Sequence, residues 1–350
     1  MDKKIRINML SQATSVSGQG VGSAYMEQVS LVKENKDIFE VYENKHGNKF
    51  EICHIHTVNP QYFVRMNNKH VNIMYVHFIP ETLDGSIKLP KLAFKIFKWY
   101  VIKMYRKADE IVVVNPVFKE PLIKLGIKDD NITYIPNYVS KEQFHPIDNQ
   151  LVDSVKEKYK ISKDKFVVLG CGQVQTRKGV KDFVEVAKRL PDFEFVWAGG
   201  FSFGAITDGH KELKAIMDNP PSNVKFIGII PRDEMNDIFN ASDALFMPSF
   251  SELFPMSILE AVNSSKPVVL RDLELYRDIL FGRYLHACDI DGWVDIFKRL
   301  RDDKNYLNKA QLDSKYISEF YSKEHVNELW REYYSNMYLK YLKLGKKFKK

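Results

Sequence analysis

Two glutamates, Glu252 and Glu260, stand eight positions apart in the most informative spacing of the sequence. We expect the first on a loop after a strand and the second about two turns into the next helix. A carboxylate accepts hydrogen bonds from hydroxyls, so the pair suits a ribose and a hexose. The amides between them lie at a helix start, which suits phosphate. Without further context, the spacing favours a capping glutamate and an exposed helix glutamate. Four residues between them could contact such a ligand: Phe254, Pro255, Met256 and Ser257.

A second candidate is the segment Gly172–Gly179, which follows the first strand-like run in the second half of the chain. Gly172 leaves room for a ligand, and Gln173 lies beside it. Arg177 and Lys178 add fixed cations, which stabilise the charge that develops on a leaving diphosphate without requiring a metal. The alternative is a solvated basic turn, which the glycines make less attractive.

The third candidate is the segment Gly18–Gly22, between the first strand-like run and a helix expected to start near Ser23. Gly20 and Gly22 let backbone amides approach a ligand, and a helix N-terminus favours negative charge. We interpret the segment as a diphosphate or sugar contact. A flexible strand-to-helix loop is the alternative.

Three histidines at the ends of strand-like runs form the fourth candidate: His54, His56 and His77. No helix offers a pair of histidines at metal-ligand spacing and no cysteine joins them, so we predict no metal site. A histidine at a strand's carboxyl end suits hydrogen bonding or proton transfer. We favour that interpretation for His77 and a core position for His54.

These candidates follow short apolar runs that alternate with helical stretches. Such runs predict parallel sheets covered on both faces, and the series occurs twice, around the polar stretch Tyr138–Lys163. We therefore predict an α/β fold of two Rossmann-like, doubly wound domains facing each other across a cleft. The predicted domains are residues 1–150, residues 151–325 and a C-terminal helix and basic tail, residues 326–350. The predicted strands are Ile5–Leu10, Ile38–Tyr42, Glu51–His56, Ile73–His77, Ile111–Asn115, Ile132–Ile135, Phe166–Cys171, Phe193–Ala198, Val224–Ile227, Ala244–Met247 and Pro267–Leu270.

Composition is that of an ordinary globular protein with 350 residues, 45% of them hydrophobic, and a net charge of +7. The positive charge suggests an anionic partner. No apolar run approaches a membrane span, and the N-terminus turns polar too soon for a secretory signal. The three cysteines lie far apart, and we expect Cys53 and Cys171 to be buried free thiols, as in a reducing cytosol.

Taken together, these segments resemble retaining glycosyltransferase family 4, whose members have the GT-B fold. The similarity is an ordered series over nearly the whole chain. Its segments are Gly18–Gly22, His77, Ala108–Asn115, Ile135–Val139, Gly172–Gly179 with Lys178 in the lysine position, and Glu252 with Glu260 as the E-x7-E signature. The sequence departs from the family pattern where Gln173 replaces an arginine, Pro255 a glycine, and Arg271–Glu274 a glycine pair.

Three segments more narrowly resemble diacylglycerol hexosyltransferases of low-GC Gram-positive bacteria: Gly18–Tyr25, Gly172–Gly179 and Trp197–Gly204. That resemblance implies transfer of galactose or glucose from a UDP-hexose to α-glucosyl-diacylglycerol, with retention. The products would be membrane glycolipids and lipoteichoic-acid anchors. No cofactor is implied, and the effect of Mg²⁺ stays open.

The resemblance also implies roles for single residues. Lys178 and Arg177 would contact the diphosphate, Glu260 the ribose, and Glu252 the hydroxyls of the donor sugar, with His77 near the transferred sugar. We expect His77, Glu252 and Lys178 to be the catalytic residues.

A basic and aromatic stretch predicts contact with a membrane. Between Lys88 and Lys107, four lysines (Lys88, Lys91, Lys95 and Lys98) share one face of a helix, with aromatic residues between them. Such helices bind anionic bilayers, although this one must also cover a sheet. Two further basic stretches are Pro60–His70 and Tyr338–Lys350. We therefore expect a cytoplasmic enzyme, peripheral on the inner face of the cell membrane.

Three other functions are compatible with parts of the pattern. Transfer to a soluble sugar or a polysaccharide needs the same donor site. A UDP-sugar epimerase would need acid and base groups around the sugar that the sequence does not place. A non-catalytic protein that binds nucleic acid fits the charge, but no recognised nucleic-acid module is present, so we expect no nucleic-acid partner.

Overall fold

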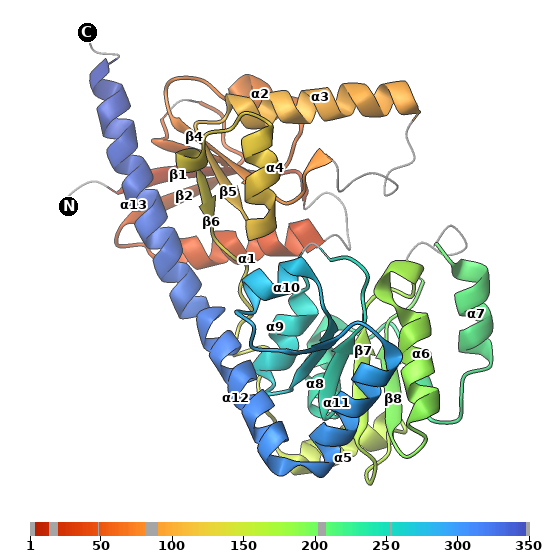
Figure 1. The fold of residues 1–350 in the computed structure, drawn as a ribbon. Coiled ribbons are helices and arrows are strands. Elements are labelled where there is room, and N and C mark those ends of the chain that lie inside the picture. Colours follow the sequence, from red (N-terminus) through yellow and green to blue (C-terminus); the bar gives the residue numbers. More distant parts are fainter. Residues whose placement is uncertain are drawn as a thin grey trace. The chain divides into compact units, whose positions relative to one another are not determined.

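Two parallel six-stranded sheets organise the chain in the computed structural model, which describes residues 4–13, 20–47, 49–80, 90–201, 208–252 and 254–347. The chain divides into two compact units. The first unit comprises Met1–Asn137 together with Lys323–Lys350, and the second comprises Tyr138–Ser322. Figure 1 shows helices on both faces of each sheet. Central strands such as β4 (Val71–Val76) and β7 (Val167–Cys171) are buried throughout, as expected for parallel strands covered on both sides.

The sheet of the first unit has the strand order β2-β1-β3-β4-β5-β6. Every pairing is parallel, and its core includes Ile7, Ile55, Ile73 and Val112. Its other strands are β1 (Ile5–Leu10), β2 (Phe39–Glu43), β3 (Ile52–Ile55), β5 (Glu110–Val113) and β6 (Ile132–Tyr134). Its helices are α1 (Gly20–Glu34), α2 (Pro60–Arg65), α3 (Lys91–Lys107), α4 (Lys119–Lys124) and α13 (Lys323–Lys347).

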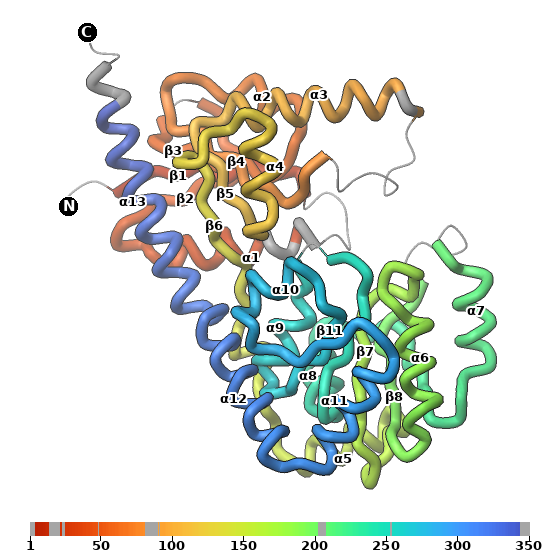
Figure 2. Tube along the Cα trace, in the orientation of Figure 1, coloured from red at the N-terminus to blue at the C-terminus, as the bar shows by residue number. Residues whose placement is uncertain are grey.

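The last helix, α13, returns to the first unit, where it packs against α1, β3 and β4. Figure 2 traces this return in blue. The Tyr334 hydroxyl lies 2.7 Å from Nδ1 of His54 and accepts a hydrogen bond from the Gln28 side chain at 3.2 Å. Lys340 pairs with Glu110 at the start of β5. A segment from the far end of the sequence therefore completes the core of the first unit.

The sheet of the second unit has the order β12-β11-β10-β7-β8-β9. Aromatic side chains fill its core, including Phe183, Trp197, Phe246 and Trp293. Its remaining strands are β8 (Glu194–Ala198), β9 (Val224–Gly228), β10 (Ala244–Met247), β11 (Val268–Arg271) and β12 (Leu285–Ala287). Its helices are α5 (Asn149–Lys158), α6 (Val180–Arg189), α7 (His210–Asp218), α8 (Met235–Asn240), α9 (Met256–Asn263), α10 (Glu274–Ile279), α11 (Ile290–Asp302) and α12 (Lys304–Phe320).

The predicted α/β fold with two doubly wound sheets is confirmed, with strand ends shifted by one or two residues. One strand was missed. β12 has only three residues and lies at the sheet edge, half-exposed, so it carries no apolar run. Cys53 and Cys171 are buried free thiols, as predicted, and Cys288 is exposed.

Strand order locates the point in each sheet where a ligand is expected. In a doubly wound sheet, the order in which strands are added reverses at the switch point. Ligands bind there, beyond the carboxyl ends of the strands. In the first unit, the switch lies between β1 and β3, and in the second between β7 and β10. We therefore expect ligand sites in the loops after these four strands.

Candidate active site

In the second unit, the loops after β7 and β10 are bonded to each other. The Phe250 amide donates to the Arg177 carbonyl at 2.8 Å, and the Arg177 guanidinium donates to the Ser251 carbonyl at 2.7 Å. Gly179 has φ +70°, and a Cβ there would lie 2.3 Å from the Pro248 carbonyl oxygen. Only glycine permits so close an approach with that backbone. The two loops therefore form one rigid pair beside the switch point.

A cavity of about 290 Å³ lies at this switch point. We call it the charged cavity. Its floor is backbone: a Cβ on Gly199 would lie 1.9 Å from the Gly172 carbonyl oxygen, so the loops after β7 and β8 touch. The predicted residues that line it are Gly172, Gln173, Lys178, Ser257 and Glu260. Five predicted residues from two separate segments therefore line one cavity.

Glu252 lies beside the charged cavity and holds a lysine of its lining. The Lys178 ammonium donates to Glu252 Oε1 at 2.6 Å, and Arg177 lies 3.3 Å from Oε2. The side chains of Lys178 and Glu252 are mostly buried, with 13% and 6% exposed. A buried pair with this geometry fixes both charges in position. Arg177, predicted as a donor contact, is 42% exposed and does not line the cavity.

Glu260 is the fifth residue of α9, about one turn into the helix rather than the expected two. Its side chain is 5% exposed and pairs with Arg232. Burial raises the pKa of Glu260, and the arginine opposes that shift. Arg232 also lies 4.8 Å from the centre of the Phe144 ring, so one guanidinium makes both a cation–π contact and the ion pair with Glu260.

The remaining predicted residues lie around the start of α9 with structural contacts. Pro255 is the N-cap residue, and the Phe254 ring packs 5.9 Å from that of Tyr321. Met256 opens the helix, and the Ser257 hydroxyl lies 3.2 Å from the Met247 sulfur. Of this group, only Ser257 lines the charged cavity.

Arg271 stands where the family pattern has glycine, and it braces the loop that carries Glu252. Its Nε donates to the Pro248 carbonyl at 3.0 Å, and its guanidinium pairs with Asp182. The Phe250 ring lies 4.0 Å from the same guanidinium. The arginine therefore ties the loop to α6.

The first unit has its own cavity at its switch point, with a volume of about 460 Å³. We call it the histidine cavity, because His56 after β3 and His77 after β4 line it. Burial lowers the pKa of His77 to about 4 and that of His56 well below its ordinary value. His54 lies in the core as predicted, with Nδ1 bonded to Tyr334.

The helix that follows the predicted glycine loop begins earlier than expected. Helix α1 starts at Gly20, so Gly20 and Gly22 belong to its first turn rather than to a loop before Ser23. A Cβ on Gly22 would lie 3.1 Å from the Ala13 carbonyl oxygen, which explains the glycine by close packing. Gly18 and Gln19 lie outside the described residues.

Several residues of both cavities were missed from the sequence. Arg232 lies after β9, outside every motif considered, and its partner Glu260 is 28 positions away. Its position after a parallel strand was the signal that could have found it. Other missed residues include Ile229, Ile230 and Met235 in the charged cavity, and Gln12, Phe78 and Phe97 in the histidine cavity.

Comparisons with known proteins identify the family. A family model described as "Glycosyl transferases group 1" matches residues 152–308, and one described as "Glycosyltransferase Family 4" matches residues 34–143. The alpha-galactosylglucosyldiacylglycerol synthase of Streptococcus pneumoniae is 41% identical over 95% of this chain and 90% of its own length. The chain belongs to glycosyltransferase family 4. It is therefore an enzyme that transfers sugar, as the resemblance implied.

Two further matches agree with this assignment. The processive diacylglycerol alpha-glucosyltransferase of Acholeplasma laidlawii is 24% identical over 80% of this chain and 82% of its own length. The solved structure of Anabaena HepE in complex with UDP and glucose matches with a TM-score of 0.73 at 14% identity, covering 95% of this chain and 99% of that one. The predicted GT-B fold is confirmed.

The described residues contain neither a metal-binding group of side chains nor a membrane-spanning helix. No group of three or more His, Cys, Asp or Glu side chains among them is arranged to hold a metal ion. None of the helices in that part of the chain has the length and apolar character to cross a membrane.

Proposed function

We propose that this glycosyltransferase moves galactose or glucose from a UDP-hexose to α-glucosyl-diacylglycerol at the surface of an anionic membrane, with retention at the transferred carbon. The observation that carries the proposal is the charged cavity, where a glycine floor, a fixed lysine and a buried carboxylate meet at one switch point. The 41% identical relative is named for a galactosylated glucosyldiacylglycerol, which supports the choice of acceptor and makes galactose the first donor to try.

The donor fits the charged cavity group by group. The ammonium of Lys178 has three N–H donors, and Glu252 accepts from one of them, so the lysine can still donate to a diphosphate. Glu260 accepts hydrogen bonds from the ribose hydroxyls. Burial raises the pKa of this carboxyl, and the Arg232 guanidinium favours its ionised form. Glu252 holds Lys178 and reaches the hydroxyls of the donor sugar.

The reaction then depends chiefly on electrostatics. The bond between the sugar's C1 and the β-phosphate oxygen breaks, and an acceptor hydroxyl oxygen bonds to C1 from the same face. The hydroxyl proton passes to the departing phosphate. Lys178, and Arg177 beside it, stabilise the negative charge that grows on the diphosphate. Because these cations are already held by Glu252, they reorganise little during the reaction.

Membrane contact is assigned to one face of α3. Leu92, Ile96 and Trp99 are spaced four and three residues apart, so they share one side of the helix, and they are 72%, 59% and 61% exposed. The opposite side is core, with Val101 and Met104 fully buried. A helix that covers its sheet with one face and presents apolar residues on the other is suited to an interface.

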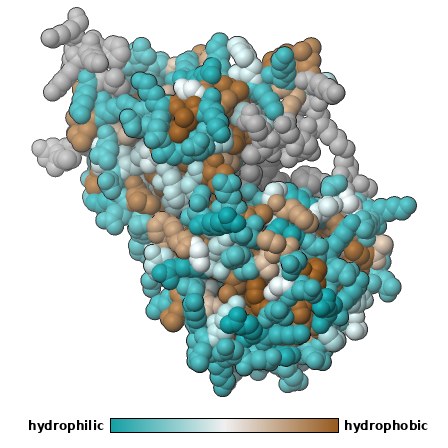
Figure 3. Space-filling view, in the orientation of Figure 1, coloured by the Kyte–Doolittle hydropathy of each residue, from teal (hydrophilic) through white to brown (hydrophobic). Residues whose placement is uncertain are grey.

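Cations surround this exposed face. Lys95 and Lys103 are exposed on the same helix, and the Lys103 ammonium lies 4.8 Å from the Trp99 ring centre. In Figure 3, brown surface lies among teal at the upper right, over α3. Each lysine near an anionic bilayer adds on the order of 1 kcal/mol of attraction. The predicted four-lysine stripe is only partly described, because Lys88 and the Lys91 side chain lie outside the described residues.

We infer from this face that the enzyme works as a peripheral protein on the inner face of the cell membrane. The acceptor's two acyl chains keep it in the bilayer, so the active site must come to the lipid. In this proposal the first unit, which holds most of the predicted domain 1–150, receives the acceptor. The second unit, which holds most of the predicted domain 151–325, binds the donor.

The test is transfer of radiolabel from UDP-galactose and from UDP-glucose, separately, into anionic vesicles that contain α-glucosyl-diacylglycerol or plain diacylglycerol. Label in a dihexosyl lipid from one donor is the expected result, and it identifies the sugar. UDP release with soluble acceptors and no labelled lipid would overturn the acceptor assignment while leaving the enzyme a glycosyltransferase.

A further inference from the structure

The histidine cavity carries no formal charge in its lining. Among the described residues that line it, none is Lys, Arg, Asp or Glu. The charged cavity, by contrast, is lined by Lys178, Arg232 and Glu260. A buried site without a cation binds a phosphate poorly, because the anion loses its hydration without a compensating charge. The lining therefore favours an uncharged ligand.

Two imidazoles supply the polar groups of this cavity. His56 is 2% exposed, and neither of its ring nitrogens has a hydrogen-bond partner among the described residues. Nε2 of His77 is likewise enclosed and unpaired within that set. The two ring centres lie 6.2 Å apart. Buried polar atoms are normally satisfied, so these nitrogens point to a ligand with several hydrogen-bonding groups.

Both imidazoles are neutral near pH 7. Burial lowers the pKa of His77 to about 4 and places that of His56 well below its ordinary value. A neutral imidazole has one N–H donor and one acceptor nitrogen. A hydroxyl likewise both donates and accepts, whereas a phosphate oxygen at this pH mainly accepts. Two neutral histidines therefore match a pair of sugar hydroxyls.

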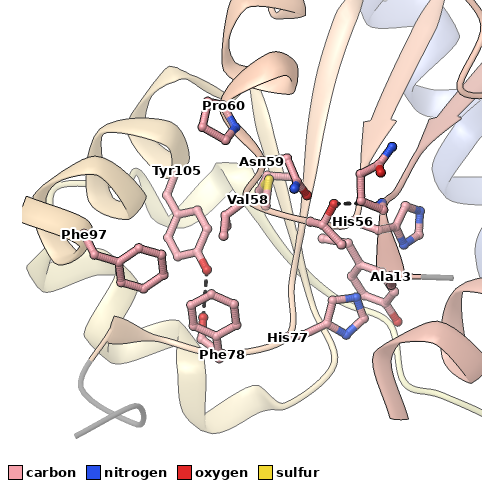
Figure 4. Close-up of a pocket in the computed structure, with 13 residues that line it drawn as sticks. Ala13, His56, Val58, Asn59, Pro60, His77, Phe78, Phe97 and Tyr105 are labelled. Carbon is pink, nitrogen blue, oxygen red and sulfur yellow. Dashed lines mark hydrogen bonds between the residues drawn. The ribbon is translucent and has the colours of Figure 1, made fainter. Parts of the chain in front are cut away.

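The other side of the cavity is aromatic. Figure 4 shows Phe78, Phe97 and Tyr105 on one side and the imidazoles of His56 and His77 on the other. The Tyr105 hydroxyl is used internally, since it donates to the Phe78 carbonyl at 2.8 Å. Phe97 belongs to α3, the helix whose opposite side exposes Leu92, Ile96 and Trp99. Two of the three aromatic residues, Phe97 and Tyr105, thus belong to the helix that carries the exposed apolar face.

Resting on the proposed function, we propose that His56 is an acceptor-specificity residue: it binds a hydroxyl of an uncharged sugar headgroup, beside the transferred sugar that His77 contacts, and the histidine cavity rejects lipid acceptors that carry phosphate. The aromatic side holds the apolar part of the acceptor next to the headgroup. The substrate class of the first unit is therefore a neutral glycolipid.

The first arm of the test measures binding to the full chain by calorimetry, with octyl α-glucoside below its micellar concentration and the same glucoside phosphorylated at the 6-position. The expected result is at least about 10-fold tighter binding of the neutral compound, because the phosphate is desolvated without a cation. Equal or tighter binding of the phosphorylated compound, or no binding of either, would overturn the proposal.

The second arm compares two substitutions at the same position. H56F removes both ring nitrogens at similar size, and H56Q restores a donor and an acceptor. We expect H56F to weaken octyl α-glucoside binding about 10-fold, as the loss of one or two hydrogen bonds predicts, and H56Q to recover most of it. UDP affinity should stay unchanged in both variants.

A matched control is H70Q, since His70 is buried in the same unit, bonds to the Phe50 carbonyl and does not line the cavity. Octyl glucoside binding by H56F at the affinity of the unmodified protein contradicts the role of His56. An equal loss in H56F and H70Q does so too. If either of these results is found while the unmodified protein still forms labelled lipid, the role of His56 fails and the proposed function stands. Absence of labelled lipid would instead contradict the proposed function, so the two outcomes are distinguishable.

Discussion

The two cavities follow one topological rule and differ in chemistry. Each lies where its sheet changes direction, beyond the carboxyl ends of the strands. The charged cavity and its rim hold two ion pairs, Lys178 with Glu252 and Arg232 with Glu260. The lining of the histidine cavity has no such pair among the described residues, only neutral imidazoles and aromatic rings. The strand order places a site, and side chains alone decide what each site binds.

The difference matches two tasks within one reaction. A diphosphate leaves with growing negative charge, so cations fixed beforehand lower the barrier. An acceptor sugar carries no charge. Ion pairs in its site would lose their hydration when the sugar binds and gain no charged partner in exchange.

Loss of Glu252 should have the largest effect. Glu252→Ala frees Lys178 and Arg177 and removes a contact to the donor sugar, so turnover should fall roughly 100- to 1,000-fold, as for other fixed electrostatic groups. Steady-state kinetics with labelled UDP-hexose measures this, and circular dichroism should show an unchanged fold. Glu212→Ala is the control, because Glu212 is exposed and pairs with Lys181 at 2.5 Å. Turnover near that of the unmodified protein in Glu252→Ala would refute its role.

Loss of the Glu260 charge should act on donor binding. Glu260→Gln keeps the shape but weakens hydrogen bonds to ribose, so KM for the UDP-hexose should rise roughly 10- to 100-fold, the range for hydrogen bonds to charged groups. The KM for the lipid acceptor should stay the same. Glu185→Gln, in an exposed pair with Lys188, is the matched control. A rise in the KM for the acceptor, with no change in the KM for the UDP-hexose, would contradict the assignment of Glu260 to the donor site.

The buried histidines should make stability depend on acid. The pKa is about 3 for His54 and about 4 for His77, against an ordinary value of 6.5. Below pH 6.5 the unfolded chain binds protons that the folded chain excludes, so stability present above that pH is lost as pH falls. Each histidine should account for about 2 kcal/mol between pH 7.5 and 5.

Denaturant unfolding at several pH values checks this sign. His54→Phe removes one of the groups, and His54 does not line either cavity. Its free energy of unfolding should therefore fall less between pH 7.5 and 5 than that of the unmodified chain. Identical pH profiles for the two proteins would show that His54 is not held neutral by the fold.

The exposed face of α3 should affect membrane binding by a smaller factor. Ile96→Ser and Trp99→Ser each remove apolar area, so partition into anionic vesicles should weaken about 10-fold, while binding to UDP is unaffected. Sedimentation with neutral and with anionic vesicles measures the apolar and the electrostatic contributions to binding separately. Leu312→Ser is the control, because Leu312 is 68% exposed on α12 of the other unit. No difference between the two vesicle types would remove the electrostatic part of the proposal.

The fold was predictable because parallel strands buried on both faces leave continuous apolar runs. β12 left none, since it is short and half-exposed. The start of α1 was placed too late, because Gly20 and Gly22 were interpreted as a loop. The close packing of Gly22 on the Ala13 carbonyl oxygen is a property of the folded backbone that the sequence does not show.

The charged cavity was predictable where its residues lie in one segment and not where they meet across segments. Gly172 and Lys178 follow one strand, and Glu260 stands at a recognisable distance from Glu252. Arg232 has no such neighbour, and its pairing with Glu260 depends on how the turn after β9 folds back. His56 was noticed after its strand, but its unpaired nitrogens are a property of three-dimensional packing alone.

The most direct test of the division between the two cavities measures two Michaelis constants in one assay, for the UDP-hexose and for α-glucosyl-diacylglycerol in vesicles. The proteins compared are the unmodified chain, Glu260→Gln and His56→Phe. The account predicts that Glu260→Gln raises only the donor constant and His56→Phe only the acceptor constant. If either variant raises the other constant, or both together, the assignment of donor and acceptor to separate cavities is contradicted.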